Sequence, residues 1–144
     1  MMRIMTVCVG NICRSPLAEV LLRRELPDYT VYSSGLGALV GQGADPLSIE
    51  IATEQGLDLL AHRAQQITSI LCQQSQLILV MEQSHKAELE RLYPVARGKV
   101  FRIGHMGQFD VADPYRQPRA AFDAAYAAIA QGVQDWVPRI RQLS

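Results

Sequence analysis

The segment CVGNICRSP, residues 8–16, decides the fold, because it lies between an apolar stretch that predicts a strand and a leucine-rich stretch that predicts a helix. MRIMTVCV is short and apolar, whereas the leucines of PLAEVLLRREL recur at helical spacing. The segment therefore predicts a loop that ends at a helix N-terminus. We expect Ser15 to cap this helix and Pro16 to take its first position, where a missing N–H leaves no donor unpaired.

Such a loop predicts an anion site. Successive backbone N–H groups and the positive end of the helix dipole form a concave surface that suits an oxyanion of phosphate size. Gly10 and Asn11 are residue types that adopt the positive φ values this curvature needs. The residues expected to surround the anion are Val9, Gly10, Asn11, Ile12, Cys13, Arg14 and Ser15.

Cys8 and Arg14 are predicted to face this anion from the strand and the helix, respectively. A cysteine attacks as its thiolate, which N–H donors, a helix N-terminus and a nearby cation all favour. A planar guanidinium grips two phosphate oxygens at once, and the Ser15 hydroxyl is placed to bond the sulfur. A lone cysteine in an apolar strand is more often a small buried hydrophobe. The complete pattern of strand, Gly-Asn turn, Arg-Ser-Pro and helix favours the chemical role.

Length and charge narrow the class of protein. The 144 residues predict a single domain, 1–144, and the 14 basic and 14 acidic residues give no net charge and no basic block. We therefore expect neither nucleic acid nor an anionic membrane surface as a partner. The longest fully apolar run, residues 124–130, is far below the roughly 20 residues that span a bilayer, so membrane insertion is not expected. The 3 cysteines cannot all pair, which favours a reduced, cytoplasmic protein.

The remaining pattern predicts an α/β fold with an open four-stranded parallel sheet, helices on both faces and the phosphate loop between the first strand and the first helix. The expected strands are about residues 3–9, 30–34, 76–82 and 99–104. The expected helices run from the loop to about 26, from 46 to a stop at Gly56, from a Thr68 cap to Cys72, over 84–93, and from Arg119 past Pro138.

The glycine-rich segment GLGALVGQGADP, residues 35–46, imitates a dinucleotide-binding fingerprint. That fingerprint belongs in the first βα turn, whereas this segment follows the second strand. The sequence therefore predicts a surface loop here, with Asp45 and Pro46 as the cap and first residue of the next helix.

CVGNICRSP and the later DPY, residues 113–115, resemble the two signatures of the low-molecular-weight protein tyrosine phosphatases. The likeness covers essentially the whole chain, since SSGLGALVGQGADP, AHRAQQIT and LILVMEQSH fall where that family has its variable loop, a structural histidine segment and its third strand. Within the family, the chain resembles most the bacterial members that act on tyrosine autokinases of capsule and exopolysaccharide export.

The resemblance implies hydrolysis of phosphotyrosine through a phosphocysteine intermediate, without metal or other cofactor. Cys8 is then the nucleophile, Arg14 holds the phosphoryl group, and Asp113 is the general acid for a phenol leaving group. The other aspartate of this region, Asp110, is then expected to be a loop carboxylate and not the general acid. The implied partner is a phosphotyrosine protein, a tyrosine autokinase in particular, and we expect the phosphatase to be a monomer.

The resemblance also suggests which residues surround the catalytic ones. Leu39 and Val40 are expected to form an apolar rim, with an ordinary flexible loop as the equally weighted alternative, and Tyr115 to stack on the substrate ring. Arg116 stands where many relatives carry a second aromatic residue.

A structural hydrogen-bond network that shapes the phosphate loop is a further implication. Its expected members are His62, Asn11, Ser15 and Ser34, and Cys72 is expected in the core.

Two alternatives are compatible with the loop. A thioredoxin-coupled arsenate reductase shares this fold, but it needs two further cysteines after the third strand, and MEQSHKAELE has none. A redox-sensing phosphotyrosine-binding protein would use Cys8 and Cys13, but binding alone needs no nucleophile together with a general acid.

Overall fold

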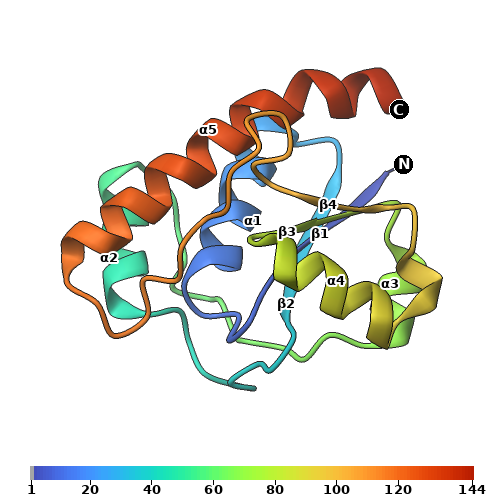
Figure 1. The fold of residues 1–144 in the computed structure, drawn as a ribbon. Helices are drawn as coiled ribbons and strands as arrows, with labels where there is room; N and C mark the ends of the chain where they lie inside the picture. The colour runs from blue at the N-terminus through green and yellow to red at the C-terminus, as the bar shows by residue number, and fades with distance from the viewer. Residues whose placement is uncertain (1) are drawn as a thin grey trace.

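The computed structural model describes residues 2–144 and contains one sheet of four parallel strands in the order β2-β1-β3-β4 (Figure 1). This confirms the predicted fold class. The strands are β1 (Arg3–Cys8), β2 (Thr30–Gly35), β3 (Leu77–Val80) and β4 (Val100–Arg102). The helices are α1 (Arg14–Glu25), α2 (Pro46–Glu54), α3 (Ser69–Gln74), α4 (Gln83–Leu92), the short 3₁₀ helix η1 (Pro94–Ala96) and α5 (Arg119–Leu143).

Helices cover both faces of the sheet, with α1 and α5 on one side and α3 and α4 on the other (Figure 1). The strands are apolar on both faces, as central parallel strands require. Ile4 and Leu79 pack with α1 and α5, whereas Met5 and Ile78 pack with the residues of α3 and α4. Cys72 is fully buried in this second core, as expected.

The strand order places the phosphate loop where open parallel sheets bind ligands. The chain moves from β1 outward to β2 and then returns past β1 to β3, so the order reverses beside β1. Ligands of such sheets bind at the carboxyl ends of the strands next to this reversal. Cys8 is the last residue of β1 and therefore lies at that point.

The start of α1 differs from the prediction. The helix begins at Arg14 with Cys13 as its N-cap and no side-chain capping bond, so Ser15 is not the cap and Pro16 is the third helical residue. Pro16 is still tolerated there, because the N–H groups of the first turn have no partner within the helix. The hydroxyl of Ser15 is instead used inside the loop.

Other predicted helix ends are confirmed. Asp45 caps α2 by accepting a hydrogen bond from Leu47 N at 2.9 Å, with Pro46 as the first helical residue. Thr68 caps α3 by accepting from Leu71 N at 3.1 Å. Gly56 follows the end of α2 with a φ of +75°, the left-handed conformation that commonly stops a helix.

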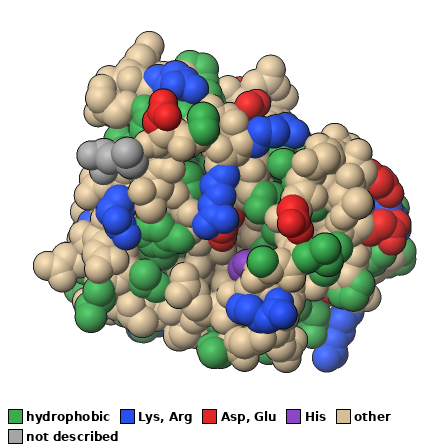
Figure 2. Space-filling model, turned by 180° about the vertical axis from the view of Figure 1, so that it is seen from behind, with side chains coloured by type: hydrophobic (Ala, Val, Ile, Leu, Met, Phe, Trp, Pro, Cys, Tyr) green, Lys and Arg blue, Asp and Glu red, His purple; other side chains and the backbone are tan. Residues whose placement is uncertain are grey.

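The outer surface carries mixed charge. On the face shown in Figure 2, basic and acidic side chains are dispersed among uncharged surface. Within residues 2–144, no helix is both long and apolar enough to span a bilayer.

Candidate active site

The loop between β1 and α1 turns its carbonyl groups away from its concave side. Six consecutive carbonyls accept hydrogen bonds from other segments: Cys8 from Leu36 N (2.9 Å), Val9 from Gly37 N (3.0 Å), Gly10 from Leu39 N (3.0 Å), Asn11 from His62 Nε2 (2.7 Å), Ile12 from Asp45 N (2.9 Å) and Cys13 from Ser48 Oγ (3.2 Å). A peptide N–H points opposite to the carbonyl of the same planar unit. The loop N–H groups therefore face inward, toward the concave side where the sequence predicts an anion site.

Two residues shape the turn of this loop. Asn11 has a φ of +58°, whereas Gly10 has no positive φ, so the asparagine alone makes the left-handed turn. Gly35, at the end of β2, lies directly against the loop, because a Cβ built on it would sit 2.3 Å from the Val9 carbonyl oxygen. Only glycine permits this close approach.

A directed chain of hydrogen bonds ends at the Cys8 sulfur. Asn11 Oδ1 accepts from Gln65 N at 2.9 Å, which identifies Nδ2 as the amide nitrogen that donates to Ser15 Oγ at 2.8 Å. Because Ser15 Oγ accepts this bond, its own proton is free to point at Cys8 Sγ, 3.0 Å away. The Ser15 hydroxyl is therefore positioned to bond the sulfur, which is the contact that the sequence predicts.

The supporting network contains Ser33 and not Ser34. Asn11 Nδ2 also donates to Ser33 Oγ at 3.0 Å, and Ser33 Oγ donates to Glu19 Oε1 at 2.6 Å. Ser34 Oγ donates instead to Met5 Sδ at 3.2 Å. Successive residues of a strand point to opposite faces of the sheet, so only one of two adjacent serines can reach the loop. His62 takes part as expected, through its bond to the Asn11 carbonyl.

Arg14 is buried, with 2% of its side chain exposed, and is oriented by acceptors on one edge of its guanidinium. Nη1 donates to Glu82 Oε2 at 2.6 Å and to the Val111 carbonyl at 2.8 Å. Nε is buried and has no partner among the described residues. Arg14 and Cys8 line the same pocket, and the planar guanidinium suits an oxyanion there.

Glu82 is a partner of Arg14 that the sequence interpretation missed. It follows β3, whose carboxyl end lies beside that of β1. The sequence did contain a signal for this contact, because an acidic residue directly after the third strand is expected near the loop that follows the first strand. The carboxyl ends of adjacent parallel strands meet at one edge of the sheet.

The two aspartates of the later loop have different surroundings. Asp113 lines the pocket, its Oδ2 lies 3.7 Å from Arg14 Nη2, and 48% of its side chain is exposed. Asp110 does not line this pocket; its Oδ1 accepts from Arg102 Nη1 and from Gln83 N, each at 3.0 Å. The structure thus places Asp113, and not Asp110, beside the anion site.

The pocket encloses about 160 Å³ and has apolar walls above the loop. Its lining residues are Cys8, Val9, Gly10, Ile12, Cys13, Arg14, Gly37, Leu39, Asp113 and Tyr115. Leu39 and Tyr115 therefore lie where the sequence placed a substrate rim. Val40 differs from the expectation, because it does not line the pocket and is 69% exposed.

Cys13 lies in the same loop with a buried side chain. Burial, together with the negative charges of Asp45 and Cys8, raises the pKa of its thiol far above the ordinary value. Cys13 therefore remains a neutral thiol at neutral pH, whereas a nucleophilic cysteine must be a thiolate.

Comparison with known proteins matches residues 3–143 to the family model of low molecular weight phosphotyrosine protein phosphatases. The chain belongs to this family. As a member of it, the chain is a protein-tyrosine-phosphatase.

Individual relatives of this phosphatase agree over nearly their whole length. The probable low molecular weight protein-tyrosine-phosphatase EpsP of Ralstonia nicotianae is 51% identical over 140 residues, which are 97% of each chain. The low molecular weight protein-tyrosine-phosphatase Wzb of Escherichia coli is 48% identical over 134 residues, 92% of this chain and 91% of that one. Vibrio vulnificus Wzb, solved in complex with benzylphosphonate, superimposes with a TM-score of 0.93 at 45% identity, covering 96% of this chain and 98% of that one.

Proposed function

We propose that this phosphatase hydrolyses phosphotyrosine in proteins by two in-line displacements at Cys8. The observation that carries the proposal is the arrangement around the sulfur: Ser15 donates to Cys8 Sγ, and Arg14, whose Nε has no partner among the described residues, lines the same pocket. A nucleophile and a phosphoryl-binding cation therefore share one anion site.

In the first displacement, the Cys8 thiolate attacks phosphorus and the bond from phosphorus to the tyrosyl oxygen breaks. Arg14 Nε and the inward N–H groups hold the equatorial oxygens, whose charge they stabilise as the phosphoryl group becomes trigonal. Asp113, as the neutral acid, gives its proton to the departing phenolate oxygen.

In the second displacement, the Asp113 carboxylate takes a proton from water while the water oxygen attacks the phosphocysteine. The bond from sulfur to phosphorus breaks, inorganic phosphate leaves, and the Cys8 thiolate is restored with Ser15 again donating to it. Asp113 ends the cycle protonated, ready for the next substrate.

The pocket walls favour an aromatic phosphate ester. Leu39, Ile12 and Tyr115 border the anion site with apolar surface, against which a phenyl ring can pack. The complex of Vibrio vulnificus Wzb with benzylphosphonate, an aryl compound with a phosphonate group, supports this substrate class.

The partner is a phosphotyrosine protein, and on the resemblance to the bacterial subgroup we propose a tyrosine autokinase that controls exopolysaccharide or capsule export. The phosphatase would act on it as a cytoplasmic monomer. Neither metal nor another cofactor takes part in the steps above.

The experiment is hydrolysis of matched phosphotyrosine, phosphoserine and phosphoarginine peptides in the presence of a metal chelator, by the native enzyme and by Cys8→Ser. We include phosphoarginine because an arginine phosphatase from Geobacillus stearothermophilus is also similar, with 28% identity and a TM-score of 0.92. We expect phosphotyrosine alone to be cleaved rapidly. Cys8→Ser should lose turnover, because a neutral serine hydroxyl does not attack, and should keep most of its binding of inorganic phosphate.

Preference for phosphoserine or phosphoarginine would contradict the proposed substrate class. Turnover by Cys8→Ser above about a thousandth of the native rate would contradict the proposed nucleophile, since removal of a catalytic nucleophile costs about 10⁶ in rate.

A further inference from the structure

A second hollow, of about 800 Å³, lies along the outer edge of the sheet at β4. It is bordered by residues of α4, by the loop that follows β4 and by the C-terminal half of α5. None of the residues around the Cys8 pocket takes part in it. The residues that line this hollow have no role in the proposed steps of phosphoryl transfer.

The hollow concentrates positive charge in a chain whose net charge is zero. Its lining includes Lys86, Lys99, Arg102 and Arg139, and no acidic residue of the described chain lines it. Lys86 and Arg102 each pair with a carboxylate that lies outside it, at 3.1 Å and 3.0 Å. Within residues 2–144, Arg139 forms no ion pair, and Lys99 Nζ donates only to a backbone carbonyl, that of Ser75, at 2.7 Å.

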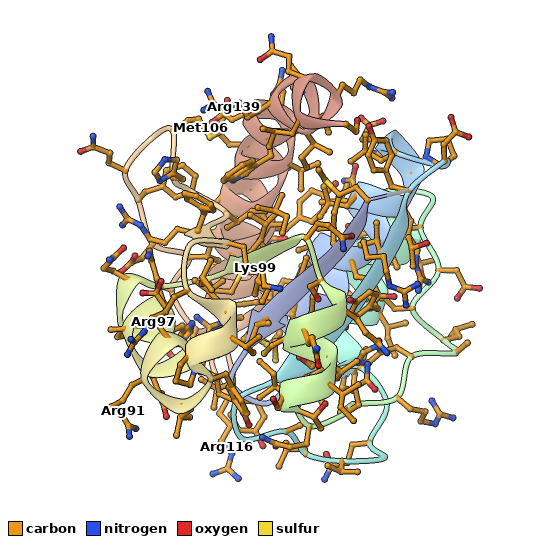
Figure 3. The ribbon with its side chains drawn as sticks, turned by 90° about the vertical axis from the view of Figure 1, so that its right-hand side faces the viewer. Arg91, Arg97, Lys99, Met106, Arg116 and Arg139 are labelled. Atoms are coloured by element: carbon orange, nitrogen blue, oxygen red, sulfur yellow. The ribbon has the colours of Figure 1, made fainter. Side chains whose placement is uncertain are left out.

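Figure 3 shows where Lys99 and Arg139 lie on one side of the molecule. Lys99 lies near the middle of this view, and Arg139 lies with Met106 at its upper end. Arg91 and Arg97 lie on the same side, away from α5. An anionic ligand that lies along this side therefore meets cations from one end to the other.

The floor of the hollow is aromatic. Phe101, His105 and Trp136 form a cluster with ring centroids 5.1 to 5.9 Å apart, and the rings of His105 and Trp136 are stacked. Met106, beside them, is 40% exposed. An apolar floor with a cationic border suits a polypeptide segment that mixes apolar and acidic side chains.

The hollow runs along β3 and β4 toward the edge of the sheet that carries the catalytic loop. Leu77 and Lys99 line it at the amino ends of β3 and β4, and Gln83 and Arg102 line it at the carboxyl ends. Cys8 lies at the carboxyl end of β1, on the same edge of the sheet as Gln83. An extended segment that leaves the hollow past Gln83 is therefore directed toward the edge of the sheet that holds the active site.

We propose that this hollow docks an acidic segment of the phosphotyrosine protein while its phosphotyrosine occupies the Cys8 pocket. The inference rests on the proposed function, since it concerns the protein that carries the phosphate. Docking raises the local concentration of phosphotyrosine near Cys8 and therefore lowers KM without changing the chemical step.

The test uses phosphotyrosine peptides that carry either a Glu-rich stretch or a matched Gln-rich stretch. Gly-Ser linkers of about five, ten and fifteen residues separate it from the phosphotyrosine, because an extended chain covers roughly 3.3 Å per residue. We expect the acidic stretch to lower KM about threefold to tenfold at one or more linker lengths, with kcat unchanged. This advantage should disappear at high salt, because exposed charges are screened.

Arg139→Glu should abolish the advantage, and it is the preferred variant because Arg139 is exposed and forms no ion pair in the described chain. Lys99→Glu should weaken it as well. Arg24→Glu, on the exposed surface of α1 outside the hollow, makes the same charge change and should keep the advantage. All three variants should hydrolyse phenyl phosphate at the native rate.

Equal KM values for the two peptide series, or an advantage that survives in both Arg139→Glu and Lys99→Glu, would overturn the docking site while leaving the phosphatase function intact. Arg139-dependent binding to anionic vesicles without any peptide effect would show a membrane contact instead and overturn it too. Failure to cleave any phosphotyrosine peptide would remove the proposed function and this inference together.

Discussion

Nη1 of Arg14 lies 2.6 Å from Oε2 of Glu82 and 2.8 Å from the carbonyl oxygen of Val111. Two acceptors on one nitrogen hold the guanidinium in a single orientation, in which Nε has no partner among residues 2–144. The orientation of this guanidinium therefore depends on a residue that follows β3, far from the loop in sequence.

Glu82→Gln should lower kcat/KM by roughly 10 to 100-fold, because a hydrogen bond to a charged group contributes about 1.5–3 kcal/mol and Arg14 would lose its compensating charge. Inhibition by vanadate should weaken in parallel, since we propose that Arg14 binds the oxyanion. Glu88→Gln, which removes an equal charge from the exposed side of α4, is the control. Native vanadate inhibition in Glu82→Gln would mean that Glu82 does not position Arg14.

Asp113→Asn should reduce phosphoryl transfer from phenyl phosphate by about 10² to 10⁴, and from nitrophenyl phosphate by clearly less. Phenolate is the stronger base and gains more from protonation as it leaves. Single-turnover measurements are needed, because in the proposed mechanism Asp113 also activates water in the second step. Asp110→Asn should change neither rate strongly, and a steep leaving-group dependence in that variant instead would reverse the assignment.

Ser33→Ala should lower kcat/KM about twofold to tenfold, because it removes the bond that helps orient the Asn11 amide, worth about 0.5–1.5 kcal/mol. Ser34→Ala is a matched control from the next position of β2, since its hydroxyl is equally buried but bonds Met5 on the other face. We expect near-native activity from it. Thermal unfolding of both variants separates loss of activity from loss of stability, and a larger loss of activity in Ser34→Ala would contradict the described network.

Stability should fall as the pH drops below about 6.5, in part because of His85. Burial lowers the pKa of this imidazole from 6.5, the charge of Arg14 acts in the same direction, and the carboxylates of Glu82, Glu88 and Asp110 oppose them. Between the lowered pKa and 6.5, the unfolded chain binds a proton that folded His85 does not. The free energy of unfolding therefore decreases with falling pH in this window.

His85→Gln should make that decrease shallower. Urea unfolding of both proteins at several pH values below 7 provides the measurement, with His105→Gln, at an exposed histidine, as the control for replacing an imidazole. An unchanged slope in His85→Gln would show that other groups account for the acid sensitivity.

The sequence by itself determined the parts of this enzyme that depend on local chain geometry. Cys8 and Arg14 lie within a single βα turn, between the strand and the helix of residues 3–26. The local geometry of this turn is therefore enough to bring the two side chains to the same predicted anion site. Caps such as Asp45 were predictable for the same reason, since the cap and the N–H group that it bonds are two residues apart.

Tertiary structure decided the contacts between segments. Which of two adjacent serines faces the loop depends on the register of β2 against β1, and both residues carry the same hydroxyl, so composition does not distinguish them. Leu39 rather than Val40 lines the pocket because of how the loop after β2 folds back onto the phosphate loop, through the bond from Leu39 N to the Gly10 carbonyl. The partnership of Arg14 with Glu82 joins positions 68 residues apart, and only the packing of parallel strands brings their carboxyl ends together.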